Sequence, residues 1–216
     1  KRLLNENFKK NKILFTSSGA VYGPRKTKKK MNELDIISVN KINKFTDYKK
    51  EYAKTKIILE QGFKKLAKKG FKVSIARLFS FIGKRILINK SFAITNLINQ
   101  AIQKNKYLKL NDSKKVFRSY MFSDDLIKWL IQILINSSSK CEVYNVGSDE
   151  LITIEKLAKL IGQKFNKSVI KKEKNKKSDH IDFYVPLTSK AKKKLNLKIN
   201  VDIKNSINML LKNYHK

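Results

Sequence analysis

The sequence contains few of the residues that form cross-links, metal centres or membrane spans. One cysteine, Cys141, stands among 216 residues, so no internal disulfide can form. This favours a reducing compartment, and we expect a cytoplasmic protein. His180 and His215 are far apart and have no cysteine partners, which argues against a metal site. The longest apolar stretch, residues 126–135, is shorter than the ~20 residues of a membrane-spanning helix and contains Lys128, so we expect no membrane partner.

Glycine and acidic residues are also scarce. The seven glycines include no G-x-x-G-x-x-G loop of the kind that holds a dinucleotide. Seventeen acidic residues face 50 basic ones, which gives a net charge of +33. Such a charge attracts polyanions, but only five of the basic residues are arginine, the side chain best suited to reading bases and phosphates. Because the lysines are spread along the chain, we expect solvated surfaces, and nucleic-acid binding is the weaker alternative.

Hydrophobic periodicity predicts an α/β fold. A buried strand is expected over residues 12–17, a helix over 51–69 that ends at Gly70, and a strand over 71–79. Strand, helix and strand in this order are typical of a parallel sheet. The remaining patterns predict the end of a helix at 1–10, loops at 24–49 and 171–178, helices at 92–103, 124–136, 153–165 and 202–214, and extended segments at 116–122 and 141–146.

A tyrosine and a lysine stand four residues apart at the start of the helix predicted over residues 51–69. Tyr52 and Lys56 share one face of a helix. There the ammonium can stabilise a phenolate, so Tyr52 could exchange a proton with a sugar or alcohol hydroxyl. The same spacing joins Tyr22 to Lys26, but Gly23 and Pro24 interrupt any helix between them. Taken alone, the Tyr52 pair is better explained as part of a lysine-rich surface helix.

Two serines follow the first predicted strand. Ser17 and Ser18 stand at its carboxyl end, where open α/β sheets bind ligands. Ser18 could therefore hydrogen-bond the reacting oxygen and align it with Tyr52. A serine that caps a turn is the alternative interpretation. The order strand, serine, loop, Tyr-x-x-x-Lys helix and strand favours the functional interpretation.

Six segments along the chain form a recognisable series. They are Phe15 to Gly23 (FTSSGAVYG), Tyr52 to Lys56 (YAKTK), Ala76 to Gly83 (ARLFSFIG), Phe117 to Asp125 (FRSYMFSDD), Tyr144 to Ser148 (YNVGS) and Tyr184 to Ala191 (YVPLTSKA). Together, and in this order over nearly the whole chain, they resemble the extended short-chain dehydrogenase/reductase family, specifically its NAD-dependent nucleotide-sugar epimerases and dehydratases.

The resemblance implies a partial Rossmann fold with a small C-terminal α/β substrate domain. The implied segments are 1–80 (the end of the Rossmann domain), 81–115 (substrate domain), 116–147 (a returning Rossmann helix and strand) and 148–216 (C-terminal substrate domain). It also implies that Tyr52 deprotonates a hexose hydroxyl during hydride transfer, that Lys56 supports Tyr52 and binds the cofactor ribose, and that Ser18 holds the sugar oxygen.

The resemblance further implies ligands and a homodimer. The cofactor would be NAD or NADP, held by Ser17, Tyr52, Lys56 and Phe79. The substrate would be a nucleotide-diphosphate sugar, held by Ser18, Ser80, Phe92, Arg118 and Lys177. Arg118 would pair with the diphosphate. Residues 1–10 and 51–69 resemble the helices through which members of the family dimerise. Their apolar faces could equally pack only in the internal core.

Departures from the family pattern favour some reaction types of the family over others. Family 4,6-dehydratases carry carboxylates where this chain has Gly19 and Ala20, which cannot transfer protons. An epimerase or 4-keto reductase is therefore preferred, with a 4,6-dehydratase as the alternative. Ser80 and Leu187 also replace residues usual in the family. Because the glycine-rich loop is absent, we expect an N-terminally truncated member that cannot bind NAD in the family's manner, and a non-catalytic remnant is a further alternative.

Overall fold

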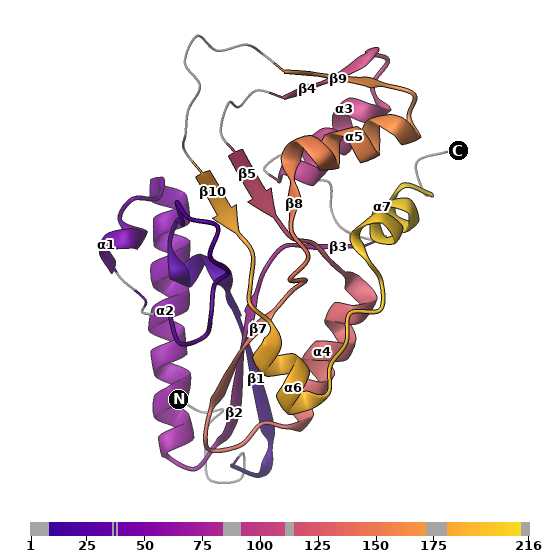
Figure 1. Cartoon of the computed structure of the whole chain (residues 1–216). Coiled ribbons are helices and arrows are strands. Elements are labelled where there is room, and N and C mark those ends of the chain that lie inside the picture. The colour runs from indigo at the N-terminus through magenta and orange to yellow at the C-terminus, as the bar shows by residue number, and fades with distance from the viewer. Residues whose placement is uncertain are drawn as a thin grey trace.

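Three parallel strands form the centre of the molecule. The computed structural model describes residues 9–35, 37, 39–83, 92–110, 115–171 and 181–212. β1 (Lys12–Ser18), β2 (Lys72–Leu78) and β7 (Glu142–Val146) pair in the order β1-β2-β7. As Figure 1 shows, α2 (Asp47–Lys68) lies on one side of this sheet, and α4 (Ser123–Ile135) and α6 (Ser189–Leu195) lie on the other. This arrangement confirms the predicted α/β fold.

Alternating residues of the central strands face two different helices. Val73 of β2 packs in one cluster with Phe63 of α2. Ala76, on the opposite face of the same strand, packs in another cluster with Trp129 of α4. A sheet covered on both faces needs apolar side chains at nearly every position. This requirement explains why β1 and β2 could be predicted from continuous apolar runs. Trp129 is buried in the core on the α4 side of the sheet.

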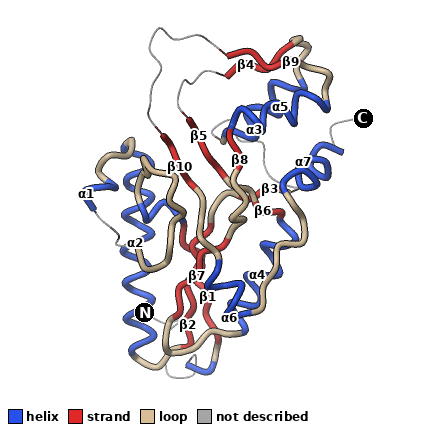
Figure 2. The backbone as a smooth tube through the Cα atoms, in the orientation of Figure 1, coloured by secondary structure: helices blue, strands red, loops and turns tan. Residues whose placement is uncertain are grey.

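Smaller sheets and three helices build the rest of the molecule around a second core. This core joins apolar residues of α3 (Ala93–Ile102), α5 (Ile154–Lys164) and α7 (Ile203–Leu211). Figures 1 and 2 show α3 and α5 beside the paired strands β4 and β9, away from the central sheet. The small sheets are β10-β5-β8, β3-β6 and β4-β9, from β3 (Phe81–Ile82), β4 (Tyr107–Leu110), β5 (Lys115–Arg118), β6 (Met121–Phe122), β8 (Ile152–Thr153), β9 (Ser168–Lys171) and β10 (Ile181–Tyr184).

The predicted helices are confirmed within a few residues, with one shift that concerns the motif. α2 begins at Asp47, not at Glu51, because Asp47 places an acidic side chain in the first turn and no helix-breaking residue follows it. Tyr52 therefore lies in the second turn. At α5 Thr153 is the N-cap residue, and its hydroxyl accepts a hydrogen bond from the Lys156 amide at 3.1 Å. The domain boundaries drawn from the resemblance remain predictions.

Other sequence predictions were incomplete. The loop predicted over 24–49 contains α1 (Val39–Ile42) and the start of α2, and the extended segment 116–122 divides into β5 and β6. The short elements η2 (Gly19–Tyr22), α6 and β8 to β10 were missed, because a few residues carry too little periodicity to reveal them. Residues 1–8 and 172–178, which held most of the predicted first helix and the charged loop, lie outside the described residues, as do His180 and His215.

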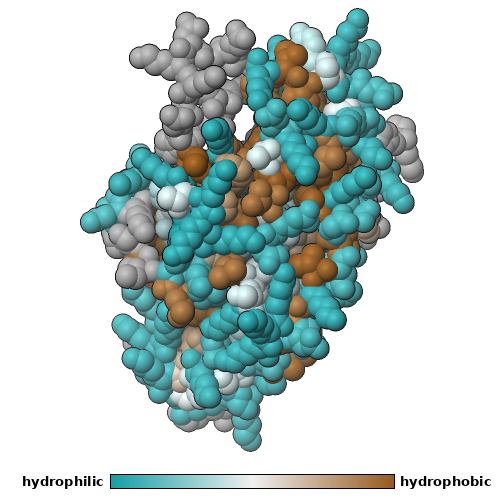
Figure 3. All heavy atoms as spheres, viewed as in Figure 1, coloured by the Kyte–Doolittle hydropathy of each residue, from teal (hydrophilic) through white to brown (hydrophobic). Residues whose placement is uncertain are grey.

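Figure 3 shows hydrophilic side chains over most of the drawn face, with hydrophobic residues visible between them. Among the described residues, no helix combines the length and the apolar character needed to cross a membrane.

Candidate active site

The side chains of the two serines at the end of β1 lie on opposite sides of the strand and have different partners. The Ser17 hydroxyl is buried and donates to Glu60 Oε1 at 2.6 Å. The Ser18 hydroxyl accepts from the Ala20 amide at 3.2 Å, so it caps η2, and it is also hydrogen-bonded to the Tyr184 phenol. Ser17 thus has a partner inside the fold. Ser18 agrees with the interpretation as a turn-capping serine, because it caps η2. It also agrees with the interpretation as a ligand-binding serine, because it faces the Tyr184 hydroxyl.

Tyr52 and Lys56 lie together beside β1, as their spacing predicted. The Lys56 ammonium is 5.7 Å from the centroid of the Tyr52 ring and 5.1 Å from that of Phe15. It donates to the Thr16 carbonyl at 2.8 Å, which fixes it at the carboxyl end of the strand. The Tyr52 side chain remains 44 % exposed. The pair is therefore anchored to the sheet while its phenol stays accessible to a ligand.

Tyr184, at the end of β10, joins the two motifs and was not singled out as a site residue. Burial raises the pKa of its phenol to about 12, and the hydrogen bond to Ser18 offsets part of that rise. Tyr52 and Arg118 also act electrostatically on Tyr184, so these groups lie near one another. At neutral pH Tyr184 is protonated and offers a second hydroxyl beside Ser18. Its place in the Tyr-Val-Pro segment was the only sequence signal for it.

The space beside Gly19 is already filled. A Cβ atom built on Gly19 would lie 2.7 Å from both the Phe79 Cζ and the Tyr184 Oη. The rings of Phe79 and Tyr184 pack with their centroids 4.7 Å apart. A side chain at position 19 would therefore have to displace the aromatic pair. The structure supplies a physical reason for the missing carboxylate at this position.

A buried polar network lies behind these groups, on the face of the sheet that α2 covers. Arg77 Nη2 and Nε donate to the Glu60 carboxylate at 2.7 and 2.9 Å, and Arg77 Nη1 donates to the Tyr22 phenol at 2.8 Å. The Tyr22 hydroxyl donates in turn to Asn145 Oδ1 at 2.8 Å. Ser17, Arg77 and Asn145 are neighbours across β1, β2 and β7. This register brings together residues that are distant in the chain, and no sequence pattern predicted the network.

Tyr22 is part of this network and cannot serve as a second copy of the Tyr-x-x-x-Lys pair. Its side chain is 2 % exposed, and burial raises the pKa of its phenol to about 12. η2 ends at Tyr22, and Gly23 follows with φ 71°, a conformation that favours glycine. The sequence interpretation that Gly23 and Pro24 interrupt a helix is confirmed.

Arg118, predicted to contact a diphosphate, forms an ion pair with Asp182 of the same chain. Its Nη2 donates to Asp182 Oδ2 at 2.6 Å and its Nη1 to Asp182 Oδ1 at 3.1 Å. The two residues lie on the paired parallel strands β5 and β10, where Arg118 is level with Tyr184. Asp182 was not singled out from the sequence. The guanidinium therefore lies near Tyr184, and the Asp182 carboxylate offsets part of its positive charge.

The remaining predicted residues are more dispersed. Phe79 is buried directly after β2, whereas Phe92 is 63 % exposed at the start of α3. The Ser80 carbonyl accepts from the Met121 amide at 3.1 Å, which joins β3 to β6. Lys177 lies outside the described residues. The structure thus brings Ser18, Tyr52, Lys56, Phe79 and Arg118 to one end of the central sheet.

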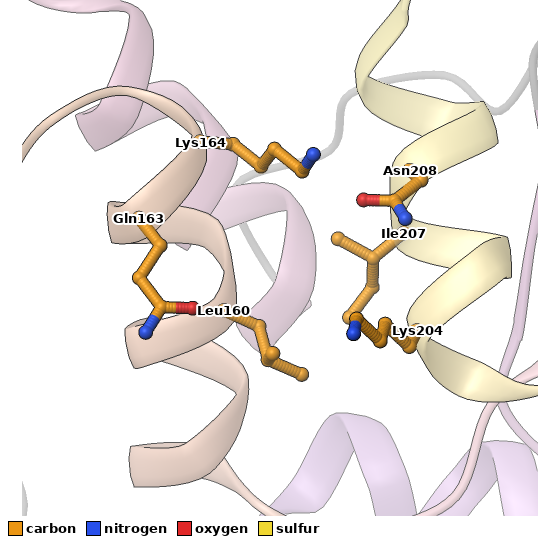
Figure 4. A pocket seen from close by; sticks show the side chains of 6 residues that line it. All are labelled: Leu160, Gln163, Lys164, Lys204, Ile207 and Asn208. Carbon is orange, nitrogen blue, oxygen red and sulfur yellow. The ribbon is translucent and has the colours of Figure 1, made fainter.

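A separate small pocket lies between α5 and α7. Figure 4 shows its lining side chains, which come from these two helices: Leu160, Gln163, Lys164, Lys204, Ile207 and Asn208. The lining offers two lysines and two amides around apolar side chains, with no carboxylate or hydroxyl group. It belongs to the second core and takes no part in the tyrosine cluster.

Comparison with known proteins identifies the family. The sequence model described as "NAD dependent epimerase/dehydratase family" matches residues 2–147, which is more than half of the chain. UDP-glucuronic acid decarboxylase 1 of Arabidopsis thaliana is 26 % identical over 204 residues, which cover 94 % of this chain and 45 % of that protein. The chain therefore spans less than half the length of this relative.

Solved structures show the same fold. The UDP-glucose 4-epimerase of Thermotoga maritima, solved with UDP-glucose, gives a TM-score of 0.75 at 18 % identity over 93 % of this chain and 62 % of that one. The dTDP-glucose 4,6-dehydratase of Bacillus anthracis, solved with NAD, gives 0.75 at 16 % identity over 99 % and 64 %. The chain belongs to the NAD-dependent epimerase/dehydratase family, as the sequence resemblance predicted.

Proposed function

We propose that this chain carries the proton-transfer and sugar-binding groups of a nucleotide-sugar enzyme of its family. Tyr52 takes the proton of a sugar hydroxyl while hydride leaves the same carbon, and Lys56 stabilises the phenolate. Ser18 and Tyr184 hold the reacting oxygen. The observation that supports this most is the convergence of Ser18, Tyr184, Tyr52 and Lys56 at the carboxyl end of β1.

NAD or NADP supplies the hydride acceptor when bound. The groups present fit its nicotinamide ribose: an ammonium has three N–H donors, and Lys56 uses one of them on the Thr16 carbonyl. Two donors remain for ribose hydroxyls, beside the exposed phenol of Tyr52. Phe79 provides an apolar surface behind them. The glycine-rich loop that holds cofactor phosphates in such enzymes does not occur in these 216 residues.

The preferred reaction is epimerisation or 4-keto reduction of a nucleotide-diphosphate sugar. A 4,6-dehydratase needs groups that move protons at C5 and at the leaving hydroxyl. Gly19 and Ala20 offer none, and Phe79 and Tyr184 fill the space in which a side chain of residue 19 would begin. Arg118 is the proposed diphosphate contact, by the paired N–H geometry that arginine uses for phosphates.

Decarboxylation is the second candidate. The curated relatives include a UDP-glucuronic acid decarboxylase that matches 94 % of this chain. Oxidation at C4 would again be the first step, and the ketone formed lies β to a C6 carboxylate, which then leaves as carbon dioxide. The groups assigned to Tyr52, Lys56 and Ser18 are the same in both reactions, so the products must distinguish them.

α2 also supports a homodimer. Tyr48, Ile58 and Leu59 are 84 %, 66 % and 42 % exposed on this helix, and a second copy of the helix would cover them. Sedimentation of the wild type and of Ile58→Asp tests this, since a charge in the interface should yield monomers. The proposed setting is the cytoplasm, with no membrane or nucleic-acid partner.

The test of the proposed chemistry is substitution of Tyr52 by phenylalanine. The full chain is incubated with NAD and either UDP-glucose or UDP-glucuronic acid, and products are identified by mass and chromatography. We expect Tyr52→Phe to lower kcat by about 10² to 10⁴-fold, the usual range for loss of an acid–base group. An isomer of the substrate supports epimerisation, loss of carbon dioxide supports decarboxylation, and loss of water supports the dehydratase.

The matched control is Tyr107→Phe. Tyr107 lies on β4, away from the central sheet, and is 39 % exposed, so the substitution removes the same phenol oxygen outside the site. Turnover that survives Tyr52→Phe would contradict the role of Tyr52. A wild-type chain that neither binds nor converts either sugar would contradict the proposed function and favour a non-catalytic remnant.

A further inference from the structure

Asp182 occupies the face of Arg118 that a diphosphate would use. Both terminal nitrogens of the guanidinium donate to its carboxylate, at 2.6 and 3.1 Å. This is the paired geometry with which arginine also binds phosphate oxygens. Arg118 Nη1 donates in addition to the carbonyls of Phe117 and Asp182 itself, at 2.8 and 3.2 Å. A phosphate therefore cannot take both nitrogens while the carboxylate stays in place.

The pair lies where solvent and ligands can reach it. The Arg118 side chain is 21 % exposed and that of Asp182 is 43 % exposed. In the Arg77–Glu60 pair these values are 3 % and 2 %. Solvent-accessible ion pairs are screened by water and add little to stability, so their partners can exchange. The carboxylate of Asp182 is thus free to give way to a competing anion.

The pair also stands beside the reacting groups. Arg118 acts electrostatically on Tyr184, which is hydrogen-bonded to Ser18 and lies near Tyr52. Tyr184 and Arg118 are level with each other on β10 and β5. An anion bound to Arg118 therefore lies next to the hydroxyl cluster, at the distance of neighbouring side chains. The group that pairs with Arg118 therefore affects how an anionic ligand enters this site.

We propose that Asp182 competes with the ligand diphosphate for Arg118 and so determines the affinity of the site. On binding, phosphate oxygens replace the two carboxylate oxygens, and the Asp182 side chain turns towards solvent. The inference rests on the proposed function, because it takes Arg118 as the diphosphate contact. Asp182 thereby weakens binding of every ligand that uses Arg118. It favours ligands whose negative charge is large enough to displace its carboxylate from the arginine.

Calorimetric titration of the full chain with UDP tests the competition. We expect Asp182→Asn to bind UDP about tenfold more tightly, because the amide leaves the guanidinium available to phosphate. Arg118→Ala should bind UDP at least tenfold more weakly. The double variant should match Arg118→Ala, since without the arginine there is nothing for Asp182 to block. Asp182→Ser serves as a second variant in case the asparagine impairs folding.

Asp149→Asn is the matched control for net charge. Asp149 pairs with Lys192 at 2.8 Å, and their side chains are 30 % and 33 % exposed, so the substitution also removes one partly exposed carboxylate. Tighter binding in Asp182→Asn and not in Asp149→Asn supports the competition. Equal or weaker binding in Asp182→Asn, with Arg118→Ala still impaired, overturns it and leaves the diphosphate contact intact. Unchanged binding in Arg118→Ala would instead refute the diphosphate assignment itself.

Discussion

Two arginine–carboxylate pairs of similar geometry lie in different parts of this molecule. Arg77 and Glu60 meet in the interior, where their side chains are 3 % and 2 % exposed, whereas Arg118 and Asp182 meet where theirs are 21 % and 43 % exposed. A buried ion cannot lose its partner without leaving an uncompensated charge. An exposed one can exchange its partner for water or a ligand. The same chemistry thus holds the sheet together in one place and remains available for binding in the other.

The largest expected effect comes from breaking the buried pair. We expect Glu60→Ala to lower the free energy of unfolding by about 3–5 kcal/mol, because Arg77 keeps its charge in the interior without a partner. Urea denaturation measures the loss. The control is Glu51→Ala on the same helix, where Glu51 pairs with Lys54 at 3.3 Å and is 68 % exposed. A change of about 1 kcal/mol or less is expected there, and equal losses in both variants would remove the distinction between the two regions.

Alkaline pH should act on the same buried network. Burial raises the pKa of Tyr22 from 10.0 to about 12, an effect that Arg77 partly offsets. Between these values the unfolded chain releases the proton while the folded chain keeps it. The unfolded state then binds fewer protons, and stability falls as pH rises through this window.

Tyr22→Phe isolates that contribution. It removes the titrating group, so its free energy of unfolding should decline less than that of the wild type between about pH 10 and about pH 12. Urea denaturation at both ends of the window provides the comparison. The lysines titrate in both proteins and cancel. The same decline in the two proteins would show that Tyr22 is not held protonated by burial.

The smallest effect is expected where the accessible pair is broken. Asp182→Asn should change the free energy of unfolding by less than about 1 kcal/mol, because Arg118 remains in contact with solvent and with backbone carbonyls. Thermal and urea denaturation beside Glu60→Ala give the contrast. A loss as large as that of Glu60→Ala would mean that Arg118 ties β5 to β10 structurally and is not free to exchange its partner.

The features that could be predicted from the sequence are local ones. Continuous apolar runs predicted the strands of the central sheet, and the spacing of Tyr52 and Lys56 predicted that they share one face of a helix. Glu60, Asn145 and Asp182 were missed because their partners come from other elements through strand register and packing. Tyr184 belongs to a four-residue strand, too short for any periodicity to reveal. Residues that meet only in three dimensions leave no pattern in a single sequence.

The most direct test of the contrast between the two pairs is NMR of the arginine side chains during titration with UDP. The chain has only five arginines, Arg2, Arg25, Arg77, Arg85 and Arg118, so their N–H signals can be resolved and assigned with single lysine substitutions. The account predicts that the Arg118 signals move in a saturable way as Asp182 is replaced, while those of Arg77 stay fixed. Arg118 signals that do not respond while UDP binds, or Arg77 signals that move in their place, would contradict it.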